Sequence, residues 1–121
     1  MFAKVLLNGS EIEAGFRTGS VTTYLAISEA RKIGLTVVLG VFKDVPTPIS
    51  FSSDLYLGVA QVVLTINKKD YKQTIFIVDD RACEKSILNN SDKKLTIGTD
   101  VMEQLGSISF NMINNTVIFN N

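Results

Sequence analysis

The sequence predicts a mainly β domain, a closed or nearly closed barrel that carries one or two short helices. Three observations lead to this fold class. Apolar residues come in short runs, many with the alternation expected of half-buried strands. Turn dipeptides such as Asn8-Gly9 and Asn114-Asn115 separate these runs. The two short helical stretches each end at a glycine, Gly34 or Gly106. Strands this short and numerous favour a barrel, because closure removes unpaired sheet edges.

In the first half of the chain we expect strands at 2–7, 11–16, 21–25 and 36–42, with a helix at 29–33. Asn8-Gly9 joins the first two strands, because both positions tolerate positive φ. Ser28 is the expected N-cap of the helix, and Gly34 its stop. Pro46 and Pro48 then interrupt the strand pattern.

In the second half we expect extended segments at 49–51 and 55–66, a polar turn at 67–70, and a strand at 71–78 that completes a long hairpin. Residues 79–94 are predicted to form a polar surface loop with a helical turn near 83–88. A strand at 95–98 leads into a helix at 100–105, with Thr99 or Asp100 as its N-cap. Strands at 108–112 and 117–119 form a closing hairpin.

Composition narrows the possible chemistry. The chain has 121 residues, which we interpret as a single domain, 1–121, taken from a longer protein. With no histidine and one cysteine, Cys83, it has no Ser-His or Cys-His pair and no set of zinc ligands. We therefore expect no metal and no cofactor.

Charge and hydropathy restrict the partners. The formal net charge is zero, which argues against direct nucleic-acid binding. No apolar run approaches the roughly 20 residues that cross a bilayer, so no membrane partner is expected. A lone cysteine without an apolar leader predicts an intracellular protein, cytoplasmic or nuclear.

Two sequence blocks carry a family resemblance. Residues 14–20 read Ala-Gly-Phe-Arg-Thr-Gly-Ser, a half-buried strand that runs into a tight turn. The second block, residues 95–106, combines a short apolar strand with Ile97, Gly98 and Asp100 and then a helix. In order and spacing the chain resembles retropepsin-like aspartic proteases, and most of all the cellular retroviral-protease-like domains of eukaryotic multidomain proteins.

The resemblance implies a site that has lost its catalytic group. In that family each subunit of a symmetric homodimer supplies one aspartate, and the pair shares a proton. Arg17 stands at the aspartate position. By the same correspondence Thr18 makes hydrogen bonds between subunits, Gly19 permits the tight turn, and Ser20 fills the small fourth position. Because guanidinium groups cannot replace two carboxylates in acid–base chemistry, we expect no catalytic residue and no protease activity.

The flap of the family also has an altered counterpart here. The equivalent residues are Lys43, Asp44, Val45, Pro46, Thr47 and Pro48. Two prolines stiffen this stretch and remove two amide donors. We therefore do not expect it to clamp a peptide as family flaps do.

The favoured function is a catalytically inactive homodimerisation or protein-interaction module. Two Arg17 side chains about 5 Å apart would repel by roughly 3–4 kcal/mol at an effective dielectric constant near 20, a cost that apolar burial can exceed. Glu11, Glu13 or Asp100 could neutralise them if the fold brings these residues close. The groove between subunits could accept an acidic or extended peptide, with Arg17 binding a carboxylate.

Other interpretations remain open. Arg17 could be an ordinary surface arginine in an unrelated turn, or a laboratory substitution. The chain could be an active aspartic endopeptidase that uses another carboxylate, or a scaffold domain in an RNA-handling assembly. The adjacent pair Asp79-Asp80 suggests a metal or acid–base site, but a solvated loop is the favoured interpretation. Asp100 is expected to be structural, at the start of a helix.

Overall fold

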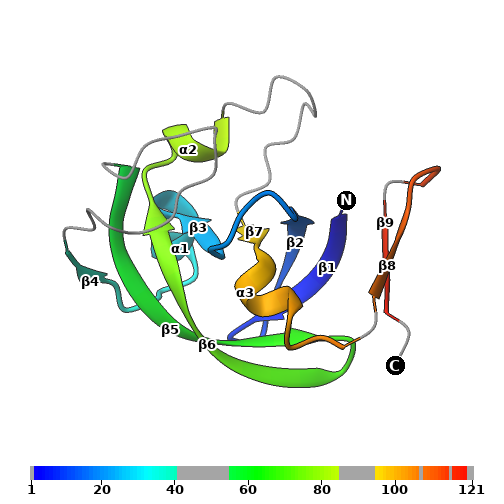
Figure 1. Ribbon diagram of the computed structural model, residues 1–121. Coiled ribbons are helices and arrows are strands. Elements are labelled where there is room, and N and C mark those ends of the chain that lie inside the picture. The colour runs from blue at the N-terminus through cyan, green and yellow to red at the C-terminus, as the bar shows by residue number, and fades with distance from the viewer. Residues whose placement is uncertain (1, 41–54, 85–94, 107, 115, 120–121) are drawn as a thin grey trace.

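The computed structural model describes residues 2–40, 55–84, 95–106, 108–114 and 116–119 (Figure 1). The flap-equivalent residues 43–48 and the extended segment predicted at 49–51 lie outside this described part. The strands are β1 (Phe2–Leu7), β2 (Ser10–Phe16), β3 (Tyr24–Ala26), β4 (Val38–Leu39), β5 (Tyr56–Ile66), β6 (Lys69–Val78), β7 (Leu95–Ile97), β8 (Ile108–Asn111) and β9 (Thr116–Phe119). The helices are α1 (Ile27–Lys32), α2 (Arg81–Glu84) and α3 (Thr99–Met102).

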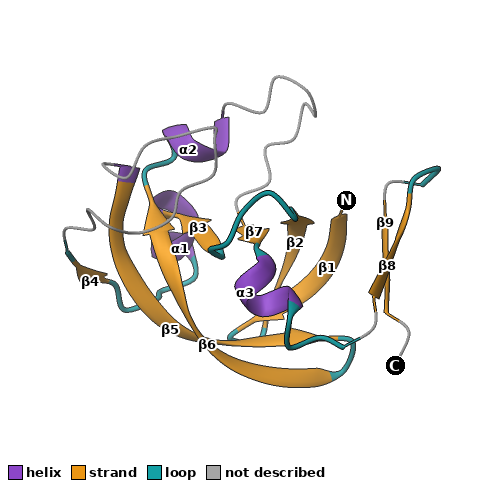
Figure 2. Cartoon of the chain, viewed as in Figure 1, coloured by secondary structure: helices purple, strands orange, loops and turns teal. Residues whose placement is uncertain are grey.

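Six strands close into a barrel, as the sequence predicts. They follow the order β5-β6-β3-β7-β2-β1, and β1 then pairs with β5 through Leu6↔Thr65 and Leu7↔Leu64. Two further pieces extend the sheet beyond the barrel. β4 pairs with β5, and the β8–β9 hairpin adjoins β1 through the parallel pair Phe2↔Thr116. Figure 2 shows this hairpin standing beside the barrel, next to β1.

The core fills the barrel because the strands alternate. Along β5 every second residue is buried, from Tyr56 to Ile66, which is the period of two that a strand imposes. β1 contributes Val5 and Leu7 in the same way, whereas β2 buries its last three residues, 14–16, in succession. A smaller cluster around Tyr24 and Val78 packs at one end.

Two hairpin turns depend on positive φ. Asn8 (φ 48°) and Gly9 (φ 84°) connect β1 to β2 as predicted. The long β5–β6 hairpin is also confirmed, but its turn is shorter than the predicted 67–70. Only Asn67 (φ 51°) and Lys68 (φ 68°) form it, because such a turn matches the twist of the flanking strands and lets Lys69 and Asp70 enter the ladder.

Two predicted strands are wrong in extent. In the predicted strand 21–25 only Tyr24 and Leu25 are β-structure, because the carbonyls of Ser20 and Val21 bond to the amides of Thr99 and Asp100 rather than to a strand. Within the described part of the predicted strand 36–42, only Val38–Leu39 pairs, against Val59 and Gly58 of β5.

The predicted helix N-caps are also wrong. Ser28 lies inside α1, whose N-cap is Ala26, and the Ser28 N–H donates to Asp80 Oδ1 (3.1 Å). The N-cap of α3 is Gly98, not Thr99 or Asp100, because the Asp100 carboxylate bonds elsewhere. The predicted glycine stops agree with the structure, since Gly34 and Gly106 both have positive φ.

Helix boundaries shift for local reasons. α3 ends at Met102, earlier than the predicted 105. α2 begins at Arg81 rather than 83, since the Asp79 carboxylate accepts the Arg81 N–H (3.0 Å) and starts the turn early.

No helix in the described ranges is long and apolar enough to cross a membrane.

The closing hairpin forms at the predicted place, with strand ends shifted by one residue. Asn111 Oδ1 accepts the N–H groups of Ile113 and Asn114 (3.0 and 3.1 Å), which shapes the turn. Phe119 packs edge-on against Phe16 of β2, with ring centroids 6.1 Å apart. This contact ties the hairpin to the strand that leads into the Arg-Thr-Gly-Ser turn.

The turn at Lys68 offers a test of the hairpin geometry. Lys68 is a non-glycine residue in the left-handed region, which costs about 1–2 kcal/mol. Lys68→Gly should therefore raise the free energy of unfolding by about 0.5–1 kcal/mol after the entropic cost of glycine. Urea denaturation measures the change. Lys72→Gly, inside β6, is the matched control and should destabilise; a loss of stability in both variants would contradict the turn geometry.

Candidate functional site

The Arg-Thr-Gly-Ser turn lies in the loop between β2 and β3, drawn in teal in Figure 2. The N–H of Arg17 donates to the carbonyl of Ile97 in β7 (3.0 Å), and the N–H of Ser20 donates back to the carbonyl of Arg17 (3.3 Å). Arg17, Thr18 and Gly19 are exposed, whereas Ser20 is fully buried. The turn therefore presents its first three residues to solvent from a backbone fixed at both ends.

The two sequence blocks meet through Thr23 and Asp100. The Thr23 hydroxyl donates to Asp100 Oδ1 (2.6 Å) and its N–H to Asp100 Oδ2 (3.1 Å), while the N–H of Gly98 donates to the Thr23 hydroxyl (3.0 Å). Asp100 Oδ1 also accepts the N–H of Val101 (2.8 Å). The carboxylate is thus engaged by three donors, in keeping with the predicted structural role but with a partner 77 residues away.

Gly98 lets the loop and β7 touch. A Cβ at this position would lie 2.4 Å from the Thr22 carbonyl oxygen and 2.8 Å from that of Ser20. Both are backbone atoms, which cannot move aside cheaply. The same approach allows the amides of Thr99 and Asp100 to donate to the carbonyls of Ser20 (2.8 Å) and Val21 (3.1 Å).

Two further hydroxyls of the loop, those of Ser20 and Thr22, are used internally. The Ser20 hydroxyl donates to the Thr22 carbonyl (2.7 Å), and the Thr22 hydroxyl shares a hydrogen bond with Tyr56 of β5 (2.8 Å). Burial raises the pKa of Tyr56 above its ordinary value, although the bond to Thr22 opposes the shift. This part of the loop is a structural framework rather than a set of reactive groups.

Arg17 is the only charged residue of the loop between β2 and β3, and of the whole stretch from Ala14 to Ser28. Two of the proposed neutralising partners are engaged elsewhere, since Glu11 pairs with Lys4 (3.5 Å) and Asp100 bonds to Thr23. Within the described ranges, no carboxylate forms an ion pair with Arg17. The described carboxylates therefore leave the guanidinium of Arg17 without an ion-pair partner.

The Asp79-Asp80 pair behaves as a solvated loop. Asp79 pairs with the Arg81 guanidinium (3.0 Å), whose hydrogen bonds lower the pKa of Asp79, and Asp80 accepts the N–H of Ser28. The two carboxylates thus serve different neighbours. No group of three or more possible metal ligands occurs among the residues that the structure describes.

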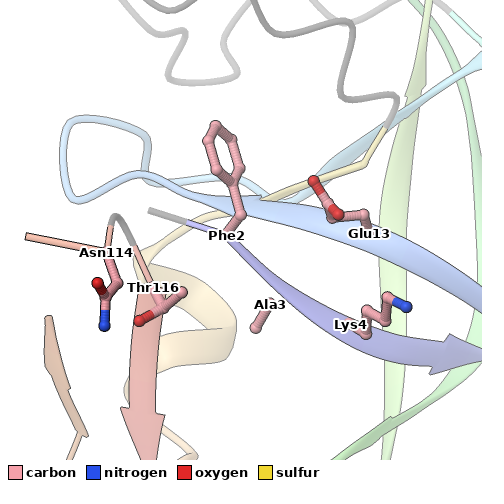
Figure 3. Close-up of a pocket in the computed structure, with 6 residues that line it drawn as sticks. All are labelled: Phe2, Ala3, Lys4, Glu13, Asn114 and Thr116. Carbon is pink, nitrogen blue, oxygen red and sulfur yellow. The ribbon is translucent and has the colours of Figure 1, made fainter. Parts of the chain in front are cut away.

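A shallow pocket opens outside the barrel, between β1, β2 and the end of the hairpin (Figure 3). Its volume is about 380 Å³, and its lining is formed by Phe2, Ala3, Lys4, Glu13, Asn114 and Thr116. The lining mixes an aromatic ring with one charge of each sign. None of the site residues predicted from the sequence lines it.

Comparisons with known proteins agree with this geometry. The sequence matches no family profile and no curated protein. Solved structures do match in shape. The fold is retropepsin-like.

Three solved structures illustrate the match. The retroviral protease-like domain of Ddi1 from Leishmania major aligns with a TM-score of 0.64 at 12% identity, covering 100% of this chain and 87% of that one. The EIAV protease, solved in complex with the inhibitor HBY-793, aligns with a TM-score of 0.58 at 14% identity over 88% of each chain. A retropepsin-like aspartic protease from Rickettsia conorii gives 0.55 at 15% identity, over 92% and 74%. At these identities the likeness concerns the retropepsin-like fold alone.

Sequence reasoning located the loop but missed the residues that hold it. In the structure Arg17 to Ser20 and Ile97 to Asp100 come together. Thr22, Thr23 and Tyr56 were not singled out, although they complete the framework. The available signal in the sequence was the set of hydroxyl residues that follows Gly19, namely Ser20, Thr22 and Thr23. This pattern does not indicate which residues they bond to.

Substitution of Gly98 tests this close approach. Gly98→Ala should lower the free energy of unfolding by at least about 2 kcal/mol, because the new methyl group meets backbone oxygens. Gly19→Ala is the matched control, since a Cβ there meets nothing within 4 Å, and it should change stability by less than about 0.5 kcal/mol. Thermal and urea unfolding measure both. Equal stability of the two variants would rule out the packing described.

Proposed function

We propose that this domain is a catalytically inactive retropepsin-like module that self-associates and binds protein partners. The observation that carries the proposal is the state of the Arg-Thr-Gly-Ser turn. Its backbone framework is complete, whereas its exposed first residue is a guanidinium with no carboxylate paired to it in the described part of the chain. Arginine has no acceptor and does not lose its proton in proteins, so it cannot activate a water molecule as a general base.

The hairpin supports the self-association part of the proposal. Residues 108–119 contain no charged residue, proline or glycine, which are the devices that usually protect an edge strand. Met112 and Ile113 at its turn are 80% and 95% exposed, and Ile118 is 45% exposed. β8 ends the sheet order, so one of its edges is unpaired within the described sheet.

A two-fold pairing of copies would cover this surface. An isologous interface uses the same patch twice, so each exposed side chain of the hairpin is buried in duplicate. Full burial of an Ile or Met side chain contributes about 1.5–3 kcal/mol. Two copies of Met112 and Ile113 thus supply enough to offset the roughly 3–4 kcal/mol repulsion of two Arg17 groups about 5 Å apart.

Sedimentation velocity over a wide concentration range tests self-association. The wild-type domain should dimerise, and the double variant Met112→Ser, Ile113→Ser should weaken the dimer at least tenfold, about 1.4 kcal/mol. The control is Val38→Ser, Leu39→Ser, which removes apolar side chains that are 63% and 75% exposed, from β4 at the other end of the sheet. A wild-type monomer at every concentration would overturn the dimer, and a larger effect of the control would move the interface to β4.

Loss of catalysis is tested separately with a peptide library between pH 3 and 7, with products identified by mass spectrometry. No cleavage is expected from the wild-type domain, and an active retropepsin run in parallel shows that the library contains suitable peptides. Cleavage that pepstatin blocks would instead support the alternative, an aspartic endopeptidase that uses another carboxylate.

A further inference from the structure

We propose that the turn formed by Arg17, Thr18 and Gly19 is a binding site for a carboxylate presented by a partner protein. The proposal rests on the protein-binding part of the proposed function, but not on self-association. Arg17 offers up to five N–H donors in a planar fork. The backbone N–H groups of Thr18 and Gly19 have no acceptor among the described residues. Three consecutive residues therefore offer unpaired donors, and the only charge among them is positive.

These donors are held in place before any ligand arrives. The carbonyl of Arg17 is occupied by the Ser20 N–H, and the N–H of Arg17 is anchored on Ile97. Ser20 is fully buried, and its carbonyl accepts the N–H of Thr99. A site whose backbone is already ordered loses less conformational entropy when it binds.

The described residues leave space beside Gly19. A Cβ built there would meet none of their atoms within 4 Å, so they do not block a ligand from the backbone. Val21, in the same loop, is 55% exposed and offers apolar surface. The site thus fits an acidic group that has an apolar neighbour, as in a peptide.

The charge count favours a carboxylate over a phosphate. One guanidinium matches a carboxylate bidentately, whereas a phosphate dianion calls for a second cation. Arg17 is the only charged residue between Ala14 and Ser28. Two carboxylates proposed to neutralise it are engaged, Glu11 with Lys4 and Asp100 with Thr23, and no carboxylate of the described residues pairs with Arg17. We therefore assign the anion to another molecule.

An NMR titration of the domain with sodium acetate tests the site, with sodium chloride at matched ionic strength as the reference. The amide signals of Thr18 and Gly19 should shift saturably with acetate and not with chloride. Arg17→Gln should abolish the saturable shift. Arg17→Lys should weaken binding several-fold, because it keeps the charge and loses the fork. Arg31→Gln, which removes an exposed arginine of α1, is the matched control and should titrate like the wild type.

Two results would overturn the site. One is the absence of a saturable shift, or the same shift in Arg17→Gln. The other is inorganic phosphate binding more than tenfold tighter than acetate, which would assign the loop to phosphate groups. The result can be told apart from the test of self-association. A monomeric domain that binds acetate would support this site and overturn the dimer. A dimeric domain that does not bind acetate would support the dimer and overturn this site.

Discussion

The hydrogen bonds between Thr23 and Asp100 are the constraint on which the rest of the site depends. They join the loop after β2 to the start of α3, two segments 77 residues apart. Gly98 makes the join possible, because any side chain there would collide with the carbonyls of Thr22 and Ser20. With this contact in place, the chain end of β2, the start of β3 and β7 are fixed relative to one another.

This framework does not involve the side chain at position 17. The bonds that position the turn use backbone atoms, the hydroxyls of Ser20, Thr22, Thr23 and Tyr56, and the carboxylate of Asp100. A substitution at this exposed position would therefore change the chemistry of the turn without removing a structural contact. The framework and the exposed group are physically separate, so the retropepsin-like fold does not depend on which side chain stands at position 17.

The Arg-Thr-Gly-Ser turn and the β8–β9 hairpin are linked by an aromatic contact across the sheet. Phe16 directly precedes Arg17 and packs edge-on against Phe119 of β9. Partly buried residues of both hairpin strands, including Ile108 and Val117, also pack against the barrel core. A partner that covers the hairpin would thus act on a surface continuous with the strand that carries the turn, which links the two parts of the proposed function.

The sequence by itself determined the barrel class, the Asn8-Gly9 turn and the charge at position 17. These follow from local rules, such as alternation along β5, positive φ at Asn8 and Gly9, and the absence of histidine. Only the tertiary structure decided that Thr23 is the partner of Asp100, and that Gly98 rather than Thr99 or Asp100 caps α3. The physical reason is range. Capping and strand preferences act over about four residues, whereas these contacts join residues more than 70 apart and override them.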